Sequence, residues 1–195
     1  MKKIFALLLL LTIGINAQSM NPAEARGLFL AVAVGPRLPI DEFTRTNTWG
    51  PGFNFELSFT NSRYVPFFAF FRAGWEHFPG YQNYYKRSDY SSISTNVIPF
   101  QIGFKHFFAP LVNDLIILLP TAEAAFTYAY VETSHQFKID SGRKNYVEET
   151  YKVGGQAGFG VSMFLLEVMA YYNYLPSMQY FSMDMKVRIP IYMNF

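Results

Sequence analysis

Residues 181–195 alternate between apolar and polar side chains without interruption. The apolar members of this segment are Phe181, Met183, Met185, Val187, Ile189, Ile191, Met193 and Phe195. Successive side chains of a β-strand point to opposite faces, so the segment predicts a strand with one apolar face and one polar face. It is much longer than a usual strand of about five or six residues. The segment therefore predicts β-structure that separates an apolar environment from a polar one.

The N-terminal residues have the pattern of a secretory signal peptide. Lys2 and Lys3 precede an apolar segment, and small residues lead up to Ala17. The apolar segment is too short for a transmembrane helix, which needs about 20 residues to cross a bilayer. We therefore expect a cleaved signal peptide over residues 1–17 and a single exported domain over residues 18–195.

Composition excludes several classes of protein. The chain has 16 basic and 14 acidic residues, and loss of Lys2 and Lys3 leaves 14 of each, so the exported domain is expected to be neutral. That balance gives no reason to expect a nucleic-acid partner. The chain has no cysteine, which excludes disulfides, thiolate chemistry and a lipid anchor on cysteine. Aromatic residues make up 19% of the chain without any long apolar run after the signal, which favours a β-protein.

Eight segments alternate with the period of a strand. They cover residues 28–36, 52–59, 64–78, 94–107, 117–131, 150–163, 166–174 and 181–195. The connectors 37–51, 79–93 and 132–149 are long, 60–63 and 164–165 are short, and 108–116 is intermediate. Outer-membrane barrels have long extracellular loops and short periplasmic turns, and this alternation matches that order. The short connector 175–179 is the one exception.

Periodicity alone does not say which face lines the barrel interior. The apolar face lines the interior of a soluble barrel such as a lipocalin, whereas it faces lipid in a membrane barrel. The polar faces here carry small residues such as Gly154, Gly158, Ala125 and Thr127, which suit the narrow interior of an eight-stranded barrel. Aromatic residues also gather toward both ends of the strands. We therefore favour a membrane barrel, with a soluble lipocalin-like ligand carrier as the alternative.

The chain resembles the small outer-membrane β-barrel proteins of the OmpA-transmembrane and OmpX type. The signal peptide, the eight two-faced strands and the terminal segment 187–195 carry the resemblance. It implies an all-β, eight-stranded antiparallel up-and-down transmembrane barrel in the outer membrane, in contact with outer-membrane lipid. It also implies that the barrel-assembly machinery reads a C-terminal signal, here Phe195, Met193 and Ile191. No further domain is expected after the last strand, and Pro190 removes a backbone donor there, which requires a bulge or an unpaired site.

Charged and polar side chains are expected to fill the lumen. The lumen faces carry Arg72, Glu76, Gln101, Lys105, Glu123, Gln156, Glu167, Lys186 and Arg188. The candidate ion-pair network among them consists of Arg72, Glu123, Arg188, Gln101, Gln156, Lys186 and Glu76. A buried charge needs a partner, so we favour a structural plug over a small diffusion pore. Arg72, Glu123 and Arg188 have similar depths, and we expect Glu123 to pair with Arg72, Arg188 or both.

The histidines raise the alternative of a lipid-modifying barrel enzyme. They are His77, His106 and His135, and Ser134 precedes the last of them. Adjacent residues of a strand point to opposite faces, so Ser134 and His135 are a poor catalytic pair. The sequence shows no third orienting residue, no metal-ligand spacing and no glycine-rich phosphate loop. We therefore expect no catalytic site, no metal and no cofactor.

Two connectors are candidates for contact with an extracellular ligand. Residues 79–93 are rich in tyrosine and include Lys86 and Arg87, and residues 132–149 contain a turn signal at 140–143 that predicts a raised hairpin. Ordinary solvated loops are the alternative. Taken together, the sequence predicts a non-enzymatic outer-membrane protein with a structural or surface-recognition role.

Overall fold

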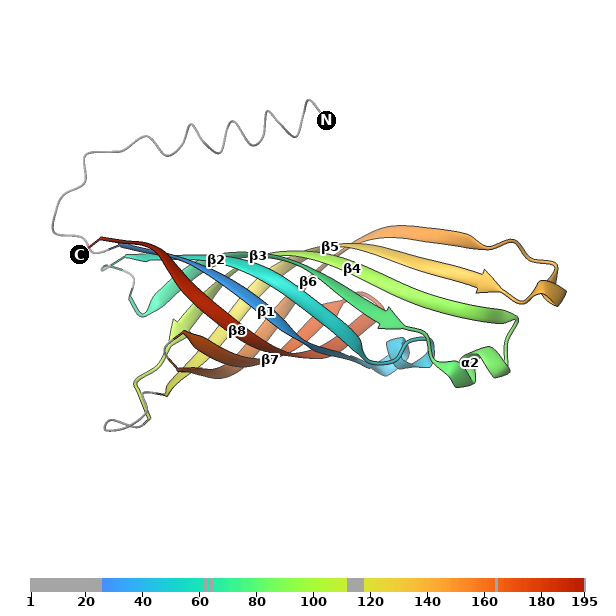
Figure 1. Ribbon diagram of the computed structural model, residues 1–195, viewed down its shortest axis with the longest axis horizontal. Coiled ribbons are helices and arrows are strands. Elements are labelled where there is room, and N and C mark those ends of the chain that lie inside the picture. The colour runs from blue at the N-terminus through green and yellow to red at the C-terminus, as the bar shows by residue number, and fades with distance from the viewer. Residues whose placement is uncertain (1–25, 62, 64, 112–117, 164, 195) are drawn as a thin grey trace, which may run out of the picture.

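Eight antiparallel strands form one closed barrel, in which each strand pairs with its neighbours in sequence and β8 pairs with β1 (Figure 1). The structure is a computed structural model that describes residues 26–61, 63, 65–111, 118–163 and 165–194. The strands are β1 (Arg26–Ile40), β2 (Gly50–Asn61), β3 (Phe67–Pro79), β4 (Tyr90–Phe107), β5 (Leu119–Phe137), β6 (Tyr146–Met163), β7 (Leu166–Leu175) and β8 (Met178–Asn194). The predicted fold class is therefore confirmed. The expected signal peptide, residues 1–17, and Phe195 lie outside the described residues.

The two ends of the barrel differ in their connections. At one end, which we call the turn end, β1 begins, β8 ends, and β2 connects to β3, β4 to β5 and β6 to β7. The opposite end, the loop end, carries the short helices η1 (Asp41–Arg45), α2 (Gln82–Lys86) and η2 (Ile139–Ser141). The β5–β6 hairpin extends beyond the other strands there (Figure 1). Within the described ranges, no helix is long and apolar enough to cross a membrane.

Strands at the loop end are longer than the sequence predicts. Pairing between β5 and β6 continues from Val131 opposite Thr150 to His135 opposite Tyr146. Much of the expected connector 132–149 is therefore strand, and only its tip turns, with Gly142 in the left-handed region at a φ of 67°. The prediction missed this extension because side chains on both faces are more polar there, which removes the apolar alternation. The expected hairpin is present.

The same extension shortens the other two long connectors. β1 continues to Ile40 and β2 begins at Gly50, so six of the fifteen residues of the expected connector 37–51 are strand. β4 begins at Tyr90, within the expected connector 79–93. The loop end is therefore built from paired backbone rather than from long irregular loops.

Burial alternates along the strands in the predicted sense. On β8, Asp184 and Lys186 are buried, whereas Met185 and Val187 are 59% and 44% exposed. Phe55 on β2 is 52% exposed, and its neighbour Glu56 is fully buried. The barrel therefore has a polar interior and an apolar outer surface, which is the arrangement of a membrane barrel and the reverse of a lipocalin-like barrel.

The pairing of β8 with β1 slips by one residue near the turn end. Leu28 lies opposite Tyr192, but Phe29 lies opposite Pro190, so Ile191 has no partner of its own. This is the bulge that the missing donor of Pro190 requires. Beyond the bulge the faces exchange, and Met193 lies opposite the buried Gly27. Met193 was expected on the lipid-facing side, and this prediction is wrong because sequence alternation does not reveal the extra residue of a bulge.

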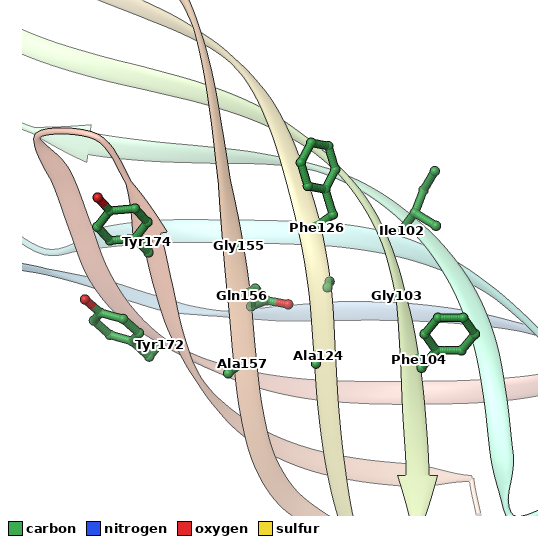
Figure 2. A pocket seen from close by; sticks show the side chains of 11 residues that line it. Ile102, Gly103, Phe104, Ala124, Phe126, Gly155, Gln156, Ala157, Tyr172 and Tyr174 are labelled. Carbon is green, nitrogen blue, oxygen red and sulfur yellow. The ribbon is translucent and has the colours of Figure 1, made fainter.

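A groove crosses the outer wall over β4, β5 and β6. Figure 2 shows small residues along its floor, among them Gly103, Ala124 and Ala157, with Tyr172 at one side and Phe104 at the other. The groove has a volume of about 510 Å³. It is part of the apolar outer surface.

Candidate functional site in the barrel lumen

The inward faces of the strands bring ten charged side chains into the interior. They are Arg37, Glu56, Arg72, Glu76, Lys105, Glu123, Glu167, Asp184, Lys186 and Arg188, and each is buried. Their contacts divide them into two groups. The central cluster contains Glu56, Arg72, Lys105, Glu123, Glu167, Lys186 and Arg188, and the loop-end cluster contains Arg37, Glu76 and Asp184.

Arg72 on β3 lies at the middle of the central cluster. Its Nη2 is 2.5 Å from Oε2 of Glu56 and also contacts Glu123 on β5. Its Nη1 donates to Oε1 of Gln156 at 2.7 Å and to Oε1 of Gln101 at 3.2 Å. The guanidinium therefore joins side chains from four other strands, two of them charged and two neutral.

Two lysines connect the three glutamates of the central cluster. Lys105 Nζ lies 2.8 Å from Glu56, 2.8 Å from Glu123 and 3.0 Å from Glu167. Lys186 Nζ lies 2.9 Å from both Glu56 and Glu123. Each buried ammonium thus has carboxylates from several strands around it, which offsets the cost of removing the charges from water.

Tyr171 on β7 completes the surroundings of Glu123. Its hydroxyl donates to Oε2 of Glu123 at 2.9 Å. The ring has room because Gly158 is its partner on β6, and a Cβ at that position would lie 2.1 Å from Tyr171 Cδ1. The small residue at 158 is therefore required by the packing of the lumen.

Arg188 lies on the turn-end side of the central cluster. It forms an ion pair with Glu167 on β7. Its guanidinium carbon is also 6.0 Å, 5.8 Å and 5.2 Å from the ring centroids of Phe29, Phe68 and Phe107. We call these three phenylalanines the turn-end collar. Arg188 is thus bounded by a carboxylate on one side and by aromatic rings on the other.

The loop-end cluster is built around Arg37 on β1. Its Nε is 2.7 Å from Oε1 of Glu76, and its Nη1 is 2.6 Å from Oδ1 of Asp184. Asn54 donates to the second oxygen of Asp184 at 2.8 Å. Gly52 makes room for the guanidinium, because a Cβ there would lie 2.5 Å from Arg37 Nε.

The charges of the two clusters balance only when they are taken together. The central cluster has four cations and three carboxylates, and the loop-end cluster has one cation and two carboxylates. The described lumen therefore carries a net positive charge toward the turn end and a net negative charge toward the loop end. An internal field of this kind favours anions on the turn-end side.

The structure brings together most of the residues selected from sequence. Arg72, Glu123, Gln101, Gln156, Lys186 and Arg188 lie in or against the central cluster, whereas Glu76 lies in the loop-end cluster. Glu123 contacts Arg72, as expected, while Arg188 pairs with Glu167 instead.

Sequence reasoning missed five members of the network: Lys105 and Glu167, which it placed in the lumen but not in the network, and Arg37, Glu56 and Asp184. Glu56 and Asp184 lie on the polar faces of the predicted strands. The alternation along the strands was therefore enough to place both side chains in the lumen. Arg37 had no such signal, because it was assigned to a connector.

The histidines lie outside the two clusters. His77 Nδ1 is 2.8 Å from Oδ1 of Asn96. His135 stacks on Tyr146 with the ring centroids 4.5 Å apart, and adjacent Ser134 points to the opposite face of β5. Among the described residues, no group of three or more His, Cys, Asp and Glu side chains is placed to hold a metal ion.

The loop end has a polar cavity of its own. The loop-end cavity has a volume of about 320 Å³ and is lined by Thr95, Thr133, Thr150, His135, Glu148 and Lys152, among others. Beyond it, Tyr90 stacks on Phe137 with the ring centroids 4.6 Å apart. The loop-end cavity thus brings hydroxyl, imidazole, carboxylate and ammonium groups together.

Comparisons with known proteins show that this chain resembles them only in its overall shape. A scan against protein-family models gives no match, and neither does a search of curated proteins. Among solved structures, neisserial surface protein A (NspA) is 10% identical with a TM-score of 0.49, over 88% of this chain and 99% of NspA.

The attachment invasion locus protein Ail of Yersinia pestis is 12% identical with a TM-score of 0.43, over 85% of this chain and 98% of Ail. Ail in complex with the heparin analogue sucrose octasulfate is 12% identical with a TM-score of 0.39, over 85% of this chain and 99% of that one. The fold assignment rests on the closed ring itself, which is the architecture of the small outer-membrane barrels that the sequence resembles.

Proposed function

We propose that this chain is an integral outer-membrane protein without enzymatic activity, in which a barrel with a plugged lumen presents the loop end to the cell exterior. Its role is structural or one of surface recognition. The observation that carries the proposal is the pattern of burial, with ion pairs inside and apolar side chains outside. In this proposal the turn end faces the periplasm, and outer-membrane lipid surrounds the wall.

The apolar outer surface supports the membrane assignment. Ile102, Phe104 and Phe126, on neighbouring strands, are 65%, 66% and 57% exposed. Each Å² of apolar surface left in water costs about 25 cal/mol, and soluble monomers rarely expose apolar patches of more than a few hundred Å². Lipid chains would cover this surface and fill the groove of Figure 2.

The ion pairs support a plug rather than a diffusion pore. Glu56, Lys105 and Lys186 are fully buried, and their charges are taken up by each other and by neighbouring residues. A hydrated pore would instead leave charged side chains in contact with water. Eight strands also give an interior just wide enough for side chains.

The loop end supports a recognition role. The candidate segments are residues 79–93 and 132–149, which contribute α2 and the tip of the β5–β6 hairpin. Aromatic rings such as Tyr90 and Tyr146 combine apolar area with hydroxyl groups, a combination suited to binding surfaces. Nothing in the charge distribution favours a nucleic-acid ligand.

Biogenesis belongs to the same proposal. Export would begin with the signal peptide at residues 1–17, and the barrel-assembly machinery would read the end of β8. The signal consists of Ile191, Met193 and Phe195. In the folded barrel the side chain of Ile191 is 56% exposed.

Reconstitution tests the proposal and its competitors. The purified chain should fold only in detergent or lipid, migrate differently in gels before and after heating, and give no sustained conductance in a planar bilayer. A stable detergent-free monomer would favour the lipocalin-like alternative, and sustained conductance would favour the pore. A change in lipid A mass when the protein is expressed would favour the lipid-modifying enzyme.

A further inference from the structure

A second cavity lies at the turn end, on the other side of the central cluster from the loop end. The turn-end cavity has a volume of about 450 Å³, within the range of about 300–1,000 Å³ that is usual for small-molecule sites. Its lining includes Phe29, Phe68, Phe107, Leu165, Met193 and Arg188. The lining is therefore apolar except for the guanidinium of Arg188 and the hydroxyl of Ser162.

The apolar lining departs from the rule that the interior of this barrel is polar. Phe29, Phe68 and Phe107 all occupy inward positions, in the same alternation that places Arg72 and Lys105 in the lumen. The bulge at Ile191 adds Met193 to this lining by turning it inward. Two independent features, an aromatic collar and a register slip, thus make the turn-end mouth apolar.

Arg188 is the polar group at this cavity, and its hydrogen bonding is incomplete. The residue is 7% exposed. Within the described part of the chain, Nε of Arg188 has no hydrogen-bond acceptor, and Nη2 forms ion pairs with Glu167 and, at 3.8 Å, with Glu56 Oε1 without a hydrogen bond to either. A buried donor without an acceptor is unfavourable, and a guanidinium does not lose its charge.

The net positive charge of the central cluster indicates that a partner of Arg188 in the cavity would be an anion. Its four cations face three carboxylates, and Arg188 is the cation that borders the turn-end cavity. One additional anion next to Arg188 would make the central cluster neutral. An anion with an apolar body would also cover the rings of the collar.

We propose that the turn-end cavity binds a single-chain anionic amphiphile with a carboxylate head, such as a medium-chain fatty acid. The carboxylate accepts hydrogen bonds from Arg188, and the alkyl chain packs against the turn-end collar and Met193. This site is at the opposite end from the proposed recognition surface. It can be tested on the purified, folded barrel whether or not the loop end binds a partner.

Photo-crosslinking in micelles of a non-ionic detergent tests the site directly. The probe is dodecanoic acid with a diazirine in its alkyl chain, and the matched control is the corresponding alcohol. The acid should label peptides around Phe107, Leu165 and Met193 in a saturable manner, and unlabelled dodecanoate should compete. The alcohol should label only outward-facing positions such as Ile189. Equal labelling by both probes, or competition by lysophosphatidate but not by dodecanoate, would overturn the assignment of a carboxylate ligand.

Variants separate binding from folding. Arg188→Gln should raise the competing dodecanoate concentration about 10- to 100-fold, the range expected for loss of a charged hydrogen bond, and Arg188→Lys should have an intermediate effect. Arg188→Gln also removes the ion pair with Glu167, so Met193→Asp provides a second test, because Met193 is 49% exposed at the mouth. Met193→Asp should weaken labelling by charge repulsion, and Met193→Gln should retain it. If heat-modifiable gel mobility shows all variants folded and labelling is the same in each, the proposal is wrong.

Discussion

Tyr171 on β7 donates a hydrogen bond of 2.9 Å to Glu123 on β5, across the intervening strand β6, where the residue between them is Gly158. The bond places a neutral donor beside a carboxylate that already contacts Arg72, Lys105 and Lys186. The central cluster therefore depends on steric room as well as on charge. Each of these dependences can be tested by a substitution.

Gly158→Ala should destabilise the barrel by about 1–3 kcal/mol, because the added Cβ would displace the Tyr171 ring in an already packed interior. The measurement is the free energy of unfolding in urea, in lipid vesicles. Gly155→Ala is the matched control on the same strand, since its Cβ would come no closer than 3.4 Å to Ala125 O. Equal losses for the two variants would contradict the packing role of Gly158.

Glu123→Gln should cost about 3–5 kcal/mol, because it leaves Arg72, Lys105 and Lys186 with one buried carboxylate fewer. Urea unfolding measures the loss, and Glu42→Gln at the exposed loop end serves as the control. An unchanged midpoint would show that Glu123 is not in a dry ion pair. An unchanged midpoint together with raised bilayer conductance would instead favour a water-filled pore.

Arg37→Gln should also cost about 3–5 kcal/mol, since Glu76 and Asp184 then remain buried without a cation. Adding Asp184→Asn should recover part of that loss, because it removes one of the two uncompensated carboxylates. A double-mutant cycle on the unfolding free energies measures this coupling. Simple additivity of the two losses would rule out the ion pair as a stabilising contact.

Ile189→Arg should cost about 2–4 kcal/mol in lipid if the side chain faces the bilayer near its midplane. Ile189 is 54% exposed on the outer wall. Tyr192→Arg is the control, because Tyr192 lies outward nearer the turn end, where the cost falls to about 0–1 kcal/mol. A loss near zero for Ile189→Arg would remove the main support for the membrane proposal.

Periodicity was enough to predict the architecture, while small residues on the polar faces and aromatic residues near the strand ends were needed to predict which face points inward. A period of two does not depend on knowing where a strand ends, so Met185 was assigned outward and Lys186 inward from sequence alone. The same pattern fails where both faces of a strand are polar, and the strand positions at His135 and Tyr146 were therefore read as loop. Strand ends at the loop end are set by pairing across the hairpin, which single-sequence patterning does not contain.

The partners within the lumen were harder to predict than the lumen itself. Alternation gives the face of a residue but not its height relative to distant strands, which depends on the stagger of the barrel. Arg188 was therefore named beside Arg72 as a possible partner of Glu123, and of the two only Arg72 contacts Glu123, whereas Arg188 pairs with Glu167. The expectation that Met193 faces lipid was wrong for a different reason. The extra residue at Ile191 is a property of two paired strands and not of either strand alone.

The contacts of Lys186 have a consequence for how the barrel is assembled. This residue belongs to the last strand, yet its ammonium group contacts Glu56 of β2 and Glu123 of β5. A chain that has formed only its first seven strands would hold these carboxylates without that cation. Insertion of β8 therefore brings the ammonium group of Lys186 to these carboxylates in the same step that closes the ring. The ion pairs of Lys186 therefore stabilise the complete barrel relative to a barrel that lacks the final strand.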